Sequence, residues 1–185
     1  MNKLILSHND FKNLVAKICR DITNSDWRPD YVVGLTRGGL LPAVMISHYF
    51  NVPCETLKVS LRDGGECESN LWMAEDALGV VPPDESKQYG GHKHLEMLKK
   101  NILIVDDIND SGATINWIIN DWPSGCFPNA DDWKNDIWNV NVRFAVVVDN
   151  LASDCLLKID YTGMEVNKAE KDVWIEFPFE EWWAK

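Results

Sequence analysis

The chain has 185 residues, 45% of them hydrophobic, which is enough for a single α/β domain (residues 1–185) with its own core. Its formal net charge of −11 argues against binding nucleic acid or an anionic membrane surface by non-specific attraction, because those partners are also negative. No apolar run is long enough to span a membrane, no secretory signal pattern opens the sequence, and the five widely spaced cysteines favour free thiols in the cytoplasm.

The N-terminal part of the chain predicts a helix and then a strand. Apolar residues recur at the spacing of an amphipathic helix over residues 9–24, and Asn9 or Asp10 is the expected cap. Residues 31–35 are apolar and rich in β-branched side chains, which predicts a buried strand.

A glycine-containing turn and a second helix follow this strand. Residues 36–39, Thr-Arg-Gly-Gly, predict a tight turn, and residues 40–50 predict a helix whose first turn contains proline, where proline is tolerated. A strand is expected over residues 55–61. Residues 62–98 are too long and too polar for an ordinary connection, so we expect a mobile lid loop there.

The middle of the chain predicts a strand over residues 102–105 and the start of a helix over residues 114–121. Residues 122–140 form an irregular insert rich in tryptophan and asparagine. These tryptophans are interpreted either as a local mini-core or as an exposed surface, which would be a dimer contact or an added regulatory surface.

Three further strands are expected near the C-terminus, over residues 143–148, 156–161 and 173–177. Strands that alternate with helices favour a mainly parallel sheet with right-handed crossovers. No linker or internal repeat divides the chain, so the sequence predicts one α/β domain.

Residues 102–114 carry the most specific pattern in the chain. The apolar strand ends in two carboxylates, Asp106 and Asp107, and a turn of small residues then leads into a helix. Amides of such a turn and of the first helical turn converge on one point, where the helix dipole also favours an anion. The adjacent carboxylates suit a ligand that carries ribose hydroxyls or Mg²⁺ beside its phosphate.

This run resembles the phosphoribosyl pyrophosphate (PRPP) motif of type I phosphoribosyltransferases, which is an apolar strand, two acidic residues, two variable residues and Asp-Thr/Ser-Gly-x-Thr. Every defining position is filled here. The resemblance implies a mainly parallel twisted sheet flanked by helices, with a small C-terminal base-binding hood. It also implies that PRPP is bound by Asp106, Asp107, Asp110, Ser111, Gly112, Ala113 and Thr114.

The turn after the first strand is the second part of the implied site. Paired glycines let the backbone approach a ligand closely, and the planar fork of an arginine suits phosphate oxygens. In the resembled family this loop binds pyrophosphate and often contains a non-proline cis peptide. The pyrophosphate-binding residues are therefore expected to be Thr36, Arg37, Gly38 and Gly39.

Residues 172–180, Asp-Val-Trp-Ile-Glu-Phe-Pro-Phe-Glu, are the third part. They resemble the base-binding end of the purine branch, and of its bacterial xanthine-guanine phosphoribosyltransferases in particular. The resemblance implies that Trp174 stacks on the base, that main-chain groups near Ile175 read its edge, and that Glu180 lies on the metal side. Stacking of a base on an aromatic side chain contributes about 1–3 kcal/mol.

One residue departs from the resembled pattern. Purine members carry a lysine at the end of the strand before the base segment, where it donates a hydrogen bond to the 6-oxo group. Here that strand ends in Asp149 and Asn150, and no lysine follows until Lys158. An aspartate accepts where a lysine donates, although Asn150 can still donate. Either the correspondence is displaced by a few residues, or the preferred base is not an ordinary 6-oxopurine.

The resemblance implies an Mg²⁺-dependent transfer of a phosphoribosyl group from PRPP to a purine base. In that reaction Asp110 accepts a proton from the base as general base, and Asp106 and Asp107 hold the ribose hydroxyls directly or through the metal. Metal ligands are expected to be Asp106, Asp107 and Glu180. Within the expected lid, the candidate cations for pyrophosphate are Arg62, Lys87, Lys93 and His94.

Two other functions compete with purine salvage. One is a regulator of the same fold that binds PRPP or a nucleotide without turnover, and the other is a transferase that uses a different base. A DNA-binding regulator would need a basic face, which this acidic chain does not offer. The resemblance also implies a homodimer or homotetramer.

Overall fold

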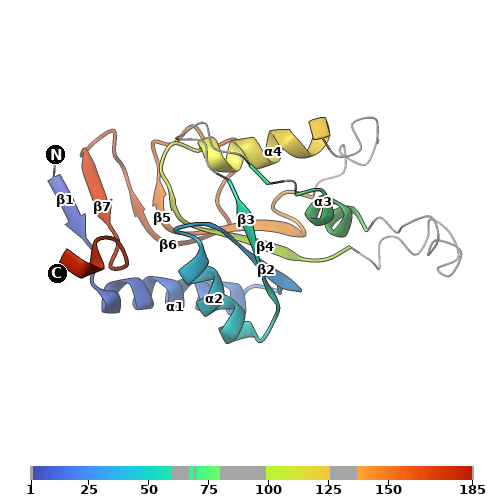
Figure 1. Cartoon of the computed structure of the whole chain (residues 1–185), viewed down its shortest axis with the longest axis horizontal. Coiled ribbons are helices and arrows are strands. Elements are labelled where there is room, and N and C mark those ends of the chain that lie inside the picture. Colours follow the sequence, from blue (N-terminus) through green and yellow to red (C-terminus); the bar gives the residue numbers. More distant parts are fainter. Residues whose placement is uncertain (1, 60–66, 69, 80–98, 126–136, 185) are drawn as a thin grey trace, which may run out of the picture.

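Five parallel strands form the central sheet of the computed structural model (Figure 1). The structure describes residues 2–59, 67–68, 70–79, 99–125 and 137–184. The spatial order of the strands is β3-β2-β4-β5-β6. Their bounds are β2 (Tyr31–Thr36), β3 (Cys54–Lys58), β4 (Ile102–Asn109), β5 (Val142–Asn150) and β6 (Tyr161–Val166). The predicted parallel α/β sheet is therefore confirmed.

Helices cover both faces of this sheet, two on each (Figure 1). Because successive side chains of a strand point to opposite faces, Val32 and Val33 of β2 enter different clusters. One cluster lies under α1 (His8–Asn24) and α2 (Leu40–Phe50), and the other under α3 (Leu71–Leu78) and α4 (Ala113–Gly125). A sheet that is buried on both faces explains the nearly continuous apolar runs of β2, β4 and β5.

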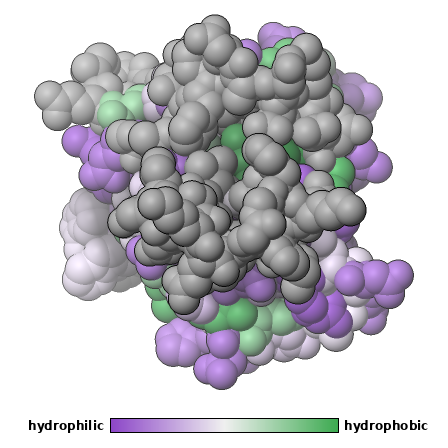
Figure 2. Space-filling model, turned by 90° about the vertical axis from the view of Figure 1, so that its right-hand side faces the viewer, coloured by the Kyte–Doolittle hydropathy of each residue, from purple (hydrophilic) through white to green (hydrophobic). Residues whose placement is uncertain are grey.

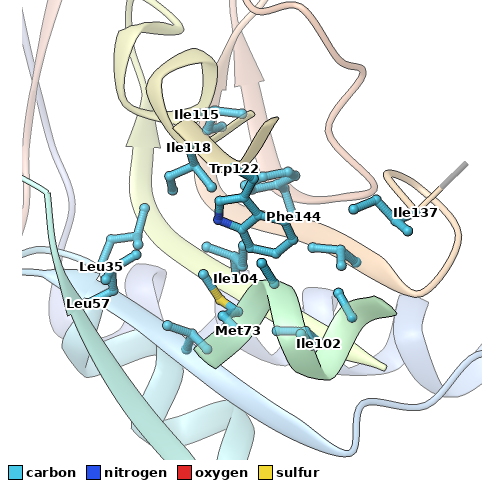
Figure 3. Packing of buried hydrophobic residues seen from close by; sticks show 14 of the residues in the cluster. Leu35, Leu57, Met73, Ile102, Ile104, Ile115, Ile118, Trp122, Ile137 and Phe144 are labelled. Carbon is cyan, nitrogen blue, oxygen red and sulfur yellow. The ribbon is translucent and has the colours of Figure 1, made fainter. Parts of the chain in front are cut away.

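Aromatic side chains fill the cluster under α4. Trp122 is fully buried, its ring centroid lies 4.7 Å from that of Trp138, and Trp138 stacks on Phe144 of β5 at 5.8 Å. Figure 3 shows Trp122 and Phe144 together, with Ile118 of α4 and Met73 of α3 nearby. These two tryptophans thus belong to the core, as the mini-core interpretation predicted, whereas Trp133 lies outside the described residues.

A small second sheet forms the predicted hood. The strand β1 (Asn2–Ile5), which the sequence analysis did not predict, pairs in parallel with β7 (Val173–Glu176). A short 3-10 helix, η3 (Trp182–Ala184), follows near the C-terminus. Both ends of the chain lie beside this sheet (Figure 1). No helix within the described ranges is long and apolar enough to cross a membrane.

The segment expected to be a lid contains a core helix. Met73, Ala74 and Ala77 of α3 are fully buried, because the helix presents its apolar face to the sheet. Residues 60–66, 69 and 80–98, and with them the four candidate lid cations, lie outside the described residues. On the face seen in Figure 2, described side chains of both hydrophilic and hydrophobic character are exposed.

Two local predictions were wrong. The first helix is capped by Ser7, not by Asn9 or Asp10, because Ser7 Oγ accepts from the Asp10 N–H (3.1 Å) while Asp10 Oδ2 accepts from the Ser7 N–H (3.0 Å). The strand expected over residues 156–161 begins only at Tyr161. Before it the backbone forms turns and is tied to α4, where Asn116 Oδ1 accepts from the Leu156 N–H at 2.8 Å.

Removal of the buried indole tests this description of the core. Trp122→Ala should lower the free energy of unfolding by about 3–5 kcal/mol, because it leaves a cavity under α4. Trp182→Ala is the matched control, since that side chain is 66% exposed and its loss should change stability by less than about 0.5 kcal/mol. Urea unfolding followed by circular dichroism measures both. Equal effects of the two substitutions would contradict the assigned core.

Candidate functional site

The residues expected to bind pyrophosphate and PRPP lie at the carboxyl ends of β2 and β4, which are neighbours in the sheet, and β5 ends beside β4. Contact between the first two ends is direct. A Cβ on Gly38 would overlap the Asp107 carboxylate, and a Cβ on Gly39 would overlap the Val105 carbonyl oxygen. Only glycine lets the turn after β2 lie this close to β4. The structure therefore brings together the two segments expected to bind pyrophosphate and ribose.

The turn after β2 has the backbone expected for it. The Thr36–Arg37 peptide is cis, and the turn closes through the Gly39 N–H, which donates to the Leu35 carbonyl at 2.9 Å. The Arg37 side chain is exposed. An exposed guanidinium beside these backbone groups can take the oxygens of a phosphate or pyrophosphate.

Asp106 and Asp107 lie inside the end of β4, which continues to Asn109, rather than after it. The Asp107 N–H donates to Asp106 Oδ1 at 2.9 Å, and the Ile108 N–H donates to Asp107 Oδ1 at 3.0 Å. Burial raises the pKa of Asp107, and the nearby charge of Glu180 adds to this effect. The site thus places a carboxylate where negative charge is costly unless a hydroxyl or a cation joins it.

The turn between β4 and α4 has the geometry of an anion site. Gly112 has a φ of +83°, and a Cβ there would lie 2.6 Å from the Cys155 backbone nitrogen. Among the described residues, the one protein acceptor recorded for the amides of residues 111–114 is Ser111 Oγ, 3.4 Å from the Ala113 nitrogen. The N-terminus of α4 therefore keeps amide donors for a phosphate.

Asp110, the expected general base, forms an ion pair that the sequence analysis missed. Its Oδ1 lies 2.6 Å from Nζ of Lys168, a residue of the loop between β6 and β7. Asn150, at the end of β5, supports both partners. Its Nδ2 donates to the Asp110 carbonyl at 2.7 Å, and its Oδ1 accepts from the Lys168 N–H at 3.1 Å. No local sequence pattern indicates this pairing.

The neighbouring Asp149 is occupied within the protein. Asn109 Nδ2 donates to Asp149 Oδ1 at 2.8 Å and also to Ser153 Oγ at 2.9 Å. Burial raises the pKa of the Asp149 carboxyl. The end of β5 therefore contributes hydrogen bonds that hold loops together. The positive charge in this region comes instead from Lys168, on the loop after β6.

The two residues expected to hold the base lie on opposite faces of β7. Trp174 is 39% exposed, so its ring remains accessible for stacking. The Ile175 side chain is buried in the cluster under α1 and its backbone faces Leu4 of β1. A role of the Ile175 main chain in reading a base therefore stays a prediction.

Glu180 comes close enough to Asp107 to raise its pKa, while its Oε2 accepts from the Phe177 N–H at 2.9 Å. No group of three or more His, Cys, Asp or Glu side chains is arranged to hold a metal ion among the described residues. Asp106 and Asp107 nevertheless fit Mg²⁺, which proteins often hold with one or two carboxylates together with phosphate oxygens of the substrate. Participation of Glu180 stays a prediction.

Comparison with known proteins agrees with this geometry. A family model described as phosphoribosyl transferase domain matches residues 1–181. The chain is 22% identical to a hypoxanthine-guanine phosphoribosyltransferase of Schizosaccharomyces pombe, over 96% of this chain and 89% of that one. It is 32% identical to a xanthine-guanine phosphoribosyltransferase of Cereibacter sphaeroides over 56% of this chain, an alignment that spans 53% of that relative.

A solved structure shows the same fold. The crystal structure of a purine phosphoribosyltransferase from Pyrococcus horikoshii superposes with a TM-score of 0.62 at 20% identity, covering 98% of this chain and 96% of that one. The two chains therefore share their overall fold at low sequence identity.

Because the carboxylate of Asp107 is partly buried and its pKa is raised, replacing it with a neutral group should stabilise the folded protein. Because its pKa is raised in the folded state, its contribution to stability is present at low pH and lost as the pH rises through that raised value. Asp107→Asn should therefore raise the urea midpoint of the ligand-free protein near neutral pH. The difference should shrink as the pH falls toward about 3.9, the ordinary value for an aspartate. A midpoint at or below that of the wild type near neutral pH would contradict this electrostatic description.

Proposed function

The chain belongs to the phosphoribosyltransferase family and is a pentosyltransferase, and we propose that it transfers a phosphoribosyl group from PRPP to a purine base of the hypoxanthine, guanine or xanthine type. Pyrophosphate is released, the reaction depends on Mg²⁺, and its role is nucleotide salvage in the cytoplasm. The observation that carries the proposal is the contact between the turn after β2 and the end of β4 at Gly38 and Asp107.

Each part of that pocket suits one part of PRPP. The amides and hydroxyls of residues 111–114 hold the 5′-phosphate at the start of α4, and Asp106 and Asp107 hold the ribose hydroxyls. The turn with Arg37 holds the pyrophosphate. Mg²⁺, when bound by Asp106 and Asp107 together with substrate oxygens, offsets the charge that builds up on the leaving pyrophosphate.

The base enters between the hood and the turn that carries Asp110. Trp174 offers an exposed aromatic face on which a planar base stacks. Asp110 then accepts the proton that leaves the ring nitrogen as that nitrogen attacks the anomeric carbon. The ion pair with Lys168 keeps the Asp110 carboxylate in place for this step. Assembly as a homodimer or homotetramer is part of the proposal by family likeness.

A nucleotide-binding regulator is the second candidate. The observation that favours it is that the carboxylate expected to accept the proton is engaged with Lys168. Such a protein would bind PRPP or a nucleotide in the same pocket without turnover.

One panel of reactions separates these functions. The protein is incubated with PRPP and Mg²⁺ and offered hypoxanthine, guanine, xanthine, adenine, orotate and uracil in turn, and pyrophosphate release is measured. Release with an oxopurine supports the proposal, and release only with another base identifies a different transferase. If no base gives pyrophosphate while PRPP binds in calorimetry, the regulator is the correct function.

Asp110→Asn tests the role of the general base. Turnover with the preferred base should fall about 100-fold or more, because an amide cannot take up the proton. The dissociation constant of PRPP should change little, since the amides of the turn remain. Steady-state kinetics and calorimetry measure the two quantities. Nearly normal turnover in this variant would rule out Asp110 as the base.

A further inference from the structure

The geometry points to Lys168 as the residue that selects the base, a role that rests on the proposed function. Its ammonium and the Asp110 carboxylate form an adjacent donor and acceptor, 2.6 Å apart, at the C-terminal edge of the sheet. We assign to this pair the recognition of a base that carries a carbonyl next to a ring N–H. Lys168 donates a hydrogen bond to the carbonyl, and Asp110 accepts one from the ring N–H. The lysine comes from the β6–β7 loop and not from the end of β5.

Asn150 fixes the position of this pair. Its side chain is buried and bonds the backbone of both partners, through the Asp110 carbonyl on one side and the Lys168 N–H on the other. The same Oδ1 also accepts from the Ala152 N–H at 3.2 Å. A single amide thus ties together the turn after β4, the loop after β5 and the loop after β6. Lys168 is therefore held in position both at its backbone N–H and at its ammonium group.

The chemistry of the pair selects between bases. An ammonium has three N–H donors and no acceptor. Among the described residues, Asp110 is the one acceptor recorded for Nζ of Lys168, so further donors remain for a ligand. A carbonyl beside the ring N–H completes two hydrogen bonds with the pair. An amino group in place of that carbonyl would direct its own N–H donors toward the ammonium, which cannot accept a hydrogen bond.

Partial burial makes this discrimination effective. The side chains of Lys168 and Asp110 are 18% and 33% exposed, so water screens the pair only in part. Hydrogen bonds to charged groups are among the stronger ones in proteins, and a polar group left without its partner opposes binding of the wrong base.

Substitution of Lys168 by methionine tests the assignment, because methionine keeps the apolar stem and loses the donors. The wild type should prefer hypoxanthine to adenine in kcat/KM, and inosine 5′-monophosphate to adenosine 5′-monophosphate in calorimetric binding. Lys168→Met should reduce both preferences about 10- to 100-fold. Lys168→Arg should restore most of each preference, since it keeps the charge and the donors. Thermal unfolding of each variant checks that it is folded.

Lys171→Met is the matched control, because Lys171 is an exposed lysine of the same loop. It should leave both preferences within about twofold of the wild type. Unchanged preferences in Lys168→Met would overturn the assignment. An equal slowing with both bases would overturn it as well, since it would show that Lys168 acts only through Asp110. A wild type that turns over no base would refute the proposed function alone, because the ratio of nucleotide affinities would still test Lys168.

Discussion

The close packing of the turn after β2 on the end of β4 is the constraint on which the rest of the site depends. Neighbouring strands of a sheet lie about 4.8 Å apart, so loops at their ends are brought near one another by topology alone. Contact requires more, because a Cβ on Gly38 or Gly39 would overlap the Asp107 carboxylate or the Val105 carbonyl. The two glycines therefore allow the turn proposed to hold pyrophosphate and the carboxylates proposed to hold ribose to lie close enough to contact one ligand.

Asn150 plays the corresponding role on the other side of the pocket. A side-chain amide both donates and accepts, so it can bond a carbonyl of one loop and N–H groups of two others, which neither a lysine nor an aspartate can do. Its presence at the end of β5 is therefore consistent with the supply of the cation from elsewhere. Asn150 at the end of β5 holds the loops together, and Lys168 supplies the positive charge that is missing from this strand end.

The parts of the fold and site that the sequence predicted depend on short-range patterns. The β4–α4 motif, the glycine turn and the helix from Leu40 to Phe50 are each specified within about a dozen residues, and all appear where expected. The pairing of β1 with β7 joins opposite ends of the chain, and the salt bridge of Lys168 with Asp110 joins residues that are separated in sequence by β5 and β6. Such contacts depend on loop paths, which local hydrophobic periodicity does not encode.

The balance of charge in the pocket links stability to ligand binding. The carboxylates of the proposed site are Asp106, Asp107, Asp110 and Glu180, and its cations among the described residues are Arg37 and Lys168, in a chain of net charge −11. Long-range attraction therefore cannot bring in a polyphosphate, and binding must rely on local amides and on a cation shared with the ligand. Burial already raises the pKa of Asp107, so the ligand-free protein bears the cost of a charge it does not neutralise. A cation that joins this carboxylate removes that cost and stabilises the fold by mass action. In the proposed function, the same partly buried charge therefore costs stability in the ligand-free protein and favours a metal-bound pyrophosphate as the ligand.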